Sequence, residues 1–158
     1  MTLAVFDKQG GDLDFRILRD RIIPSTWKRI DEKEAEPRGV TPLNVATGKI
    51  VALAKAGNYD KVAIIIMTDG LENASKELTV AQVRALLDEC RAKNWQVIFL
   101  GADFDNAQQA ASYNNNINAT VVASATNLRA SMTATASKRS TYGLTGQSIN
   151  YSDEEKKS

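Results

Sequence analysis

The sequence of 158 residues predicts an α/β fold with an open, mostly parallel sheet and a β-hairpin at one side. Residues 61–73 contain an unbroken apolar run that leads into a Thr-Asp-Gly turn, which is typical of a central strand buried on both faces. Strand-like and helix-like segments alternate between residues 41 and 123, and this order requires parallel strands linked by crossover helices. Residues 13–17 alternate apolar and polar side chains, as a half-exposed edge strand does.

The N-terminal hairpin is predicted from two strand-like arms, residues 2–6 and 13–17, which flank a turn-forming stretch at residues 8–12. Pro24 limits any further pairing because proline lacks an amide hydrogen. The charged stretch at residues 28–38 is predicted to be a solvated loop or a short exposed helix.

Two helices have clear start signals. The first is predicted to begin with Thr41 as N-cap and Pro42 in the first helical position, and to close at residues 57–58. The second follows the central strand of residues 61–68 and opens with a capping box between Thr79 and Gln82. Thus the central strand should lie between two helices in the chain.

The remaining elements are shorter. We expect a strand at residues 95–101, a short helix at 103–113, a strand at 119–123 and a helix of low amphipathicity at 126–138. Residues 1–138 should therefore form one domain, with residues 139–158 as a mobile polar tail.

The composition excludes several kinds of function. The net charge is +1 and the basic residues are scattered, so no surface for nucleic acid or for an anionic membrane is indicated. No apolar run approaches the roughly 20 residues that span a bilayer, and no secretory signal is evident. We therefore expect a cytoplasmic protein, or a virion component if a phage encodes it.

The chain contains no histidine and a single cysteine, Cys90. The absence of histidine rules out catalytic triads, Cys-His pairs and His-zinc sites within the chain. Cys90 falls on an apolar helix face and is expected to be a small core residue. Carboxylates, hydroxyls and amides remain, and their oxygens suit Mg²⁺ or Ca²⁺.

The order of several motifs along the chain indicates a protein family more specifically than any one of these motifs does. Residues 38–43 (RGVTPL), a helix, an apolar strand and residues 68–75 (TDGLENAS) follow one another. In this respect the chain resembles the von Willebrand factor type A (vWA) domain family, particularly its small stand-alone bacterial and phage versions. The match runs from about residue 3 to about residue 105. It implies a Rossmann-like, doubly wound, mostly parallel sheet with an antiparallel edge strand, and a metal-ion-dependent adhesion site.

The resemblance also implies the residues of that site. In the family, a D-x-S-x-S motif, a threonine and an aspartate hold Mg²⁺, and a partner protein supplies a further carboxylate. Thr41 matches the threonine and Asp69 the aspartate. Gly70, Glu72 and Asn73 would contact a protein partner at the rim, although a simple solvated loop is the alternative for Glu72 and Asn73.

The chain departs from the family at its start. Nothing matches D-x-S-x-S, and the hairpin corresponds to the family's second and third strands. The family's first strand would lie between residues 2–6 and residues 61–68. Three possibilities would resolve this gap: the two flanking strands pair directly, a strand from another chain lies between them, or the natural protein is longer. We expect a smaller sheet or completion by a partner. Two ligands should bind Mg²⁺ weakly, because the ion prefers about six oxygens in octahedral geometry.

The leading expectation for function is a non-enzymatic protein-binding module of vWA type with an incomplete metal site, acting on a protein partner, in a homo-oligomer or in a larger assembly. The alternative is an assembly component, such as a phage virion protein, that binds through its sheet edge and its tail. A Mg²⁺-dependent hydrolase using Asp7, Asp69 and Glu72 is the weakest alternative, because the chain lacks a phosphate-binding glycine loop and a histidine base.

Overall fold

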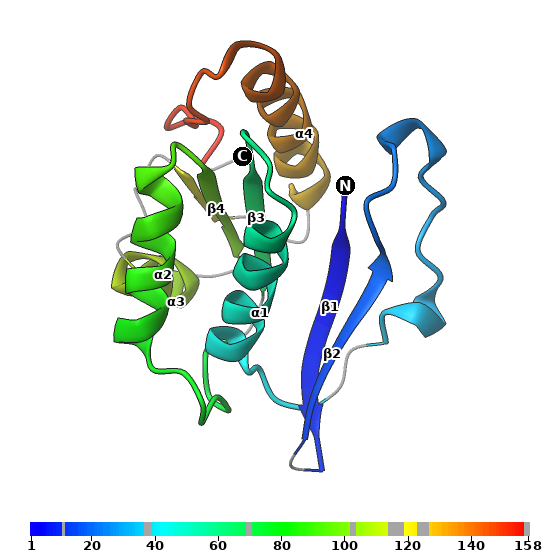
Figure 1. Cartoon of the computed structure of the whole chain (residues 1–158), viewed down its shortest axis with the longest axis vertical. Coiled ribbons are helices and arrows are strands. Elements are labelled where there is room, and N and C mark those ends of the chain that lie inside the picture. Colours follow the sequence, from blue (N-terminus) through cyan, green and yellow to red (C-terminus); the bar gives the residue numbers. More distant parts are fainter. Residues whose placement is uncertain are drawn as a thin grey trace.

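A computed structural model of the chain describes residues 1–10, 12–36, 39–68, 71–101, 104–113, 119–122 and 127–156. These residues form an α/β structure in which a two-stranded antiparallel sheet lies beside a three-stranded parallel sheet (Figure 1). The elements in chain order are β1 (Leu3–Gln9), β2 (Asp12–Arg19), α1 (Leu43–Ala56), β3 (Ala63–Thr68), α2 (Val80–Ala92), β4 (Gln96–Gly101), α3 (Phe104–Ser112), β5 (Thr120–Val122) and α4 (Leu128–Thr145).

The predicted hairpin is confirmed. β1 and β2 pair in antiparallel register, with Phe6 opposite Phe15 and Lys8 opposite Leu13. The charged stretch that follows forms a 3₁₀ turn at Glu32–Glu34 in an otherwise irregular, mostly exposed segment. Arg19 of β2 holds this segment through hydrogen bonds of 2.7 and 3.0 Å to the Glu34 carboxylate, and this ion pair lowers the pKa of Glu34 to about 2.

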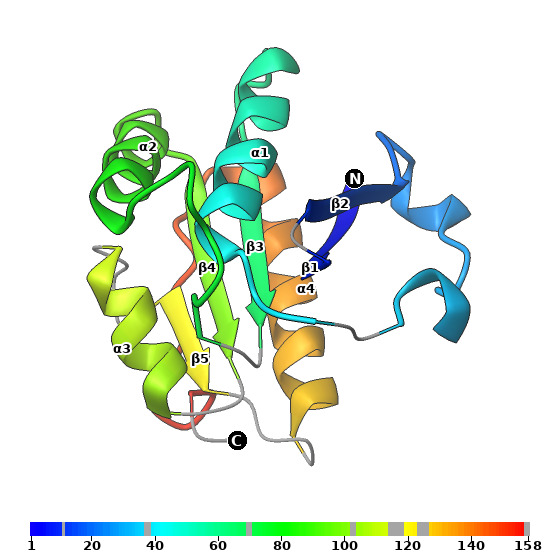
Figure 2. The same cartoon turned by 90° about the horizontal axis from the view of Figure 1, so that it is seen from below.

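The parallel sheet has the order β3-β4-β5, and helices cover both of its faces (Figure 2). One core lies between the sheet and α1, α2 and α3, and contains Ile64 and Ile66 of β3 together with Val97 and Phe99 of β4. A second core lies on the opposite face of the sheet, where α4 packs against β4. The α/β class and the parallel strands are thus confirmed.

The position of β3 differs from the prediction. Within the described residues β3 pairs only with β4, and β1 pairs only with β2 apart from a bridge between Lys8 and Val40. The expectation that β3 is a central strand buried on both faces is therefore wrong, and so is direct pairing of β1 with β3. Ile65 and Met67 are 41% and 43% exposed, and none of the described strands lies next to β3 on that edge.

The C-terminal region also differs from the prediction. α4 runs to Thr145, beyond the expected boundary at residue 138, and the chain then returns to the sheet. Ile149 and Tyr151 are both buried in the second core, and the Ile149 amide donates to the Gln96 side chain at 2.9 Å. The prediction of a mobile polar tail over residues 139–158 is wrong for the part that the structure describes, because two apolar side chains within it complete this core.

The second predicted helix, α2, opens as expected. The Thr79 hydroxyl accepts from the Gln82 amide while the Gln82 side chain accepts from the Thr79 amide. Val83, Leu87 and Cys90 of α2 are buried, which confirms Cys90 as a core residue. None of the helices in the described ranges combines the length and apolar composition needed to cross a lipid bilayer.

Candidate functional site

Three segments meet at the carboxyl ends of β1 and β3: the end of β1, the loop that enters α1, and residues 71–75, which we call the cap loop. The Lys8 and Val40 backbones exchange two hydrogen bonds, of 3.1 and 3.2 Å. The Lys8 ammonium group donates to the Ala74 carbonyl at 3.2 Å. Gly39 has φ +61°, a backbone conformation that glycine adopts without steric cost. Together these contacts hold the α1 entry beside the cap loop.

Glu72 caps helix α1 from the cap loop. One carboxylate oxygen accepts from the Asn44 amide at 2.5 Å and the other from the amides of Ala74 and Ser75 at 2.8 and 2.7 Å. The first amides of a helix lack partners within the helix and carry its positive dipole end. A carboxylate from a distant loop therefore supplies both a hydrogen bond and a compensating charge to α1.

The neighbouring side chains extend this cap. The Ser75 hydroxyl accepts from the Val45 amide at 3.2 Å and donates to Glu72 at 2.7 Å. The Asn73 side-chain oxygen accepts from the Thr41 amide at 2.9 Å, while the Asn73 amide donates to the Thr41 carbonyl at 3.3 Å. Three backbone amides at the start of α1 are thus bound by side chains of the cap loop.

The predicted N-cap role of Thr41 is wrong. α1 begins at Leu43, and its first internal hydrogen bond runs from the Ala46 amide to the Pro42 carbonyl at 3.0 Å. Pro42 occupies the cap position and makes no side-chain hydrogen bond there. Because Glu72 and Ser75 bind the first helical amides, α1 does not require a capping side chain of its own.

The environment of Glu72 favours its charged form. Partial burial opposes ionisation, but hydrogen bonds from the Asn44 and Ser75 amides, the Ser75 hydroxyl and the Ala74 amide outweigh it, so the pKa of Glu72 lies below its ordinary value. Glu72 is therefore a carboxylate at neutral pH, and both of its oxygens are engaged by donors.

A buried polar layer connects the cap to α3. The Glu72 amide donates to the Gln109 side chain at 2.5 Å, and the Tyr113 hydroxyl donates to the Asn44 side chain at 2.6 Å. Asn44 and Tyr113 are buried, and the Tyr113 ring stacks on Phe99 of β4 with ring centroids 5.7 Å apart. Burial raises the pKa of the Tyr113 hydroxyl, so it serves as a neutral hydrogen-bond donor.

The predicted site residues therefore have different surroundings. The structure brings Thr41, Glu72 and Asn73 together, whereas Asp69 and Gly70 lie outside the described residues. Glu72 and Asn73 are engaged with α1 and its entry, and their predicted contact with a partner stays a prediction.

The described residues do not provide a fit for Mg²⁺. The Glu72 carboxylate already accepts hydrogen bonds from four donors. Within the described ranges no three His, Cys, Asp or Glu side chains come together as a metal-binding group. Mg²⁺ needs a larger set of oxygen ligands than the described residues offer at this place.

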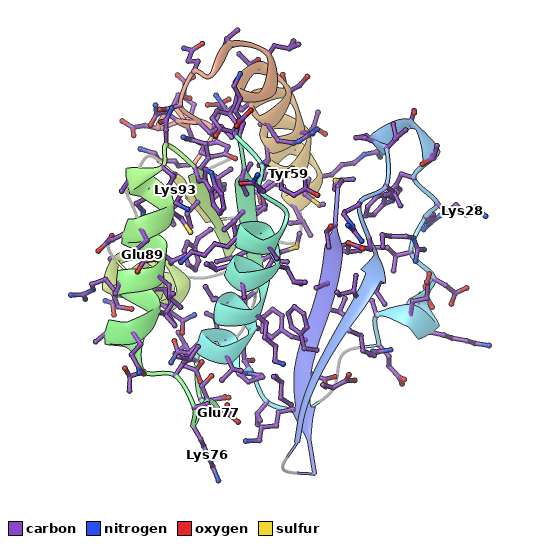
Figure 3. All side chains as sticks on the ribbon, viewed as in Figure 1. Lys28, Tyr59, Lys76, Glu77, Glu89 and Lys93 are labelled. Atoms are coloured by element: carbon purple, nitrogen blue, oxygen red, sulfur yellow. The ribbon has the colours of Figure 1, made fainter. Side chains whose placement is uncertain are left out.

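Apolar side chains are exposed at this end of the molecule. Val40 precedes Thr41 and is 44% exposed, and Leu71 begins the cap loop and is 46% exposed. Figure 3 shows Lys76 and Glu77, which follow the cap loop, extending away from the body of the protein at the same end. This end therefore presents two hydrogen-bonded loops with exposed apolar and charged side chains.

Several residues that form the cap on α1 were not among the site residues predicted from the sequence. Asn44, Gln109 and Tyr113 carry the polar layer, and Ser75 completes the cap. The polar Asn44 in the first turn of an apolar helix and the serine three residues after Glu72 were the available signals. Gln109 and Tyr113 had none, since their role depends on how α3 packs.

Comparisons with protein-family models, with curated proteins and with solved structures found no match for this chain.

Proposed function

We propose that this chain is a non-enzymatic protein-binding module of vWA type that docks a partner protein on the surface formed by Val40, Thr41, Leu71 and Asn73, which we call the loop-end surface. The observation that carries the proposal is the double hydrogen bond between Thr41 and Asn73, which fixes two exposed loops relative to each other. A preorganised surface loses less conformational entropy when it binds.

Chemistry and exposure at the loop-end surface support binding rather than catalysis. Val40 precedes Thr41 and Leu71 lies two residues before Asn73, and both offer exposed apolar contact area. The charged group of Glu72 is committed to capping α1, and the chain has no histidine to act as a base. Exposed apolar side chains that are bordered by polar residues are typical of protein-binding surfaces.

Affinity capture with matched variants tests the proposal. The wild-type chain, Leu71→Asp and Val40→Asp would be used to capture proteins from cells that encode the chain. Leu144→Asp is the control, because Leu144 is 82% exposed on α4 and follows Gly143, whose carbonyl contacts Lys61 at the opposite end of β3. We expect one partner to be retained by wild type and by Leu144→Asp and lost from both loop variants.

Two results would contradict the proposal. A partner that binds Leu71→Asp and Val40→Asp as well as it binds wild type would place the interface elsewhere. Turnover of phosphate esters or of ATP in the presence of Mg²⁺, abolished by Asp69→Asn, would indicate an enzyme instead. Repeating the capture with EDTA shows whether a metal ion contributes to the same interface.

A further inference from the structure

One edge of β3 has the backbone of an interior strand but no neighbour among the described residues. The Gln96 amide donates to the Val62 carbonyl at 2.8 Å, and the register with β4 continues from Ala63 to Thr68. In a parallel pair, alternate residues direct both backbone groups to the same neighbour. The N–H and C=O groups of Ala63, Ile65 and Met67 therefore point away from β4.

This edge carries none of the features that usually protect an exposed strand. Natural edge strands carry charged residues, proline or bulges that prevent pairing with another chain. Residues 63–67 of β3 contain no charge and no proline, and Ile65 and Met67 are about two-fifths exposed. By contrast, β2 carries Asp14, Arg16 and Arg19. β3 is thus built to be covered by a strand, whereas β2 is built as an outer edge.

Among the described residues, the edge of β1 that faces away from β2 is paired only through the bridge between Lys8 and Val40. The backbone N–H and C=O groups of Lys8 bond to Val40, on the side away from β2. The alternate residues Ala4 and Phe6 therefore also direct their backbone groups away from β2. In both views β1 is the strand of the hairpin that lies nearer to β3 (Figures 1 and 2). β1 and β3 both end at the loop-end surface, so they run in the same direction.

We propose that an extended segment of another polypeptide chain binds as a strand between β1 and β3. Main-chain hydrogen bonds would come from Ile65 and Met67 on one side and from Ala4 and Phe6 on the other. The segment should be apolar on both of its faces, because Phe6 packs against the core beneath α1. Ile65 and Met67, in register with Ile98 and Leu100 of β4, offer exposed apolar side chains on the opposite face.

The occupant is a single strand and not the β3 edge of a second copy. In each copy β1 lies beside the open edge of β3, so two β3 edges would be kept apart by the hairpins. A free tail or loop of a partner carries no sheet of its own and can pair on both sides. This binding site is separate from the loop-end surface and does not depend on the function proposed there.

Hydrogen exchange measured by NMR on the full chain tests the proposal. The probe is a synthetic peptide, Lys-Val-Ile-Val-Val-Ile-Val-Lys, and the control is the same peptide with N-methyl groups on alternate amides, which keeps the side chains but blocks half of the main-chain donors. We expect the amides of Ile65 and Met67 to exchange at least about tenfold more slowly with the probe. The amides of Ile64 and Ile66, already bonded to β4, should not change.

A pair of lysine variants completes the test. Ile65→Lys should abolish binding of the probe, while Ile17→Lys should not, since Ile17 is similarly exposed, at 43%, but lies on β2. The N-methylated peptide, used with wild type, gives an independent answer if Ile65→Lys fails to fold. The proposal is overturned if the Ile65 and Met67 amides are protected in the free chain, if the probe does not bind, or if both peptides bind equally.

Discussion

The carboxylate of Glu72 accepts a hydrogen bond from the backbone amide of Asn44 at 2.5 Å, across 28 residues of sequence. This contact joins the loop after β3 to the first turn of α1, so the two segments that flank the loop-end surface are stabilised as one unit. The same carboxylate also orders its own loop through Ala74 and Ser75. Substitution of Glu72 should therefore affect both the stability of the fold and the proposed binding surface.

Replacement of Glu72 by alanine should destabilise the fold. The substitution removes the acceptor for three backbone amides and one hydroxyl, and we expect a loss of about 2–3 kcal/mol in the free energy of unfolding. Urea denaturation followed by circular dichroism measures it. Glu77→Ala is the matched control, because Glu77 is exposed at the same end of the molecule; an equal effect of both variants would contradict the capping role.

The stability of the fold should fall with acidification partly through Glu72. Its pKa is lower in the folded chain than the ordinary glutamate value of about 4.3, so its contribution is complete above that value and is lost as pH falls through the folded pKa. Thermal unfolding between about pH 6 and about pH 3 should show a shrinking difference between wild type and Glu72→Gln. A difference that stays constant over this range would exclude the linkage.

Removal of the residues after Thr145 should open the second core. Ile149 and Tyr151 are each only 3% exposed, and the Tyr151 hydroxyl shares a 2.7 Å hydrogen bond with Thr135. Burial of two such side chains contributes about 3–5 kcal/mol, so the shortened chain should unfold at much lower urea concentration.

A chain that ends at Ser152 is the control for this truncation. It keeps both buried side chains and loses mainly the surface ion pair between Lys138 and Glu155, which is worth about 1 kcal/mol or less. If the two shortened chains are equally stable, the burial of Ile149 and Tyr151 does not stabilise the fold.

Mg²⁺ should bind this chain only weakly. Thr41 and Asp69 are the two ligands that the resemblance implies, and Glu72 is already occupied by α1. Isothermal titration calorimetry should therefore show no tight, stoichiometric binding of Mg²⁺ to wild type. Tight binding that disappears in Asp69→Ala would contradict this expectation and would restore a metal-dependent adhesion site.

Local patterns predicted the elements of this fold well. The hairpin at residues 3–19 follows from two strand-like arms around a turn-forming stretch, and the capping box between Thr79 and Gln82 gives the start of α2 correctly. These features depend on residues close together in the sequence. The α/β class follows for the same reason, since it requires only the order of strands and helices.

Features that depend on distant residues could not be predicted. Six apolar residues in a row suggested that β3 is covered on both faces, but which strands pair with it depends on the whole sheet. The cap on α1 was missed because Glu72 and Ser75 reach it from another loop, and local signals favoured Thr41. The polar composition after Ser140 suggested a tail, although Ile149 and Tyr151 anchor this otherwise mostly exposed segment to the core.

The hydrogen bond between Ile149 and Gln96 spans 53 residues, and it anchors the segment that completes the core between α4 and β4. Contacts of such long sequence separation form late because the loop between them must first be closed. During synthesis on the ribosome, the core around Ile98 and Leu100 would therefore stay incomplete until residue 151 has emerged. Nascent chains of this protein should depend on chaperones most strongly in that interval.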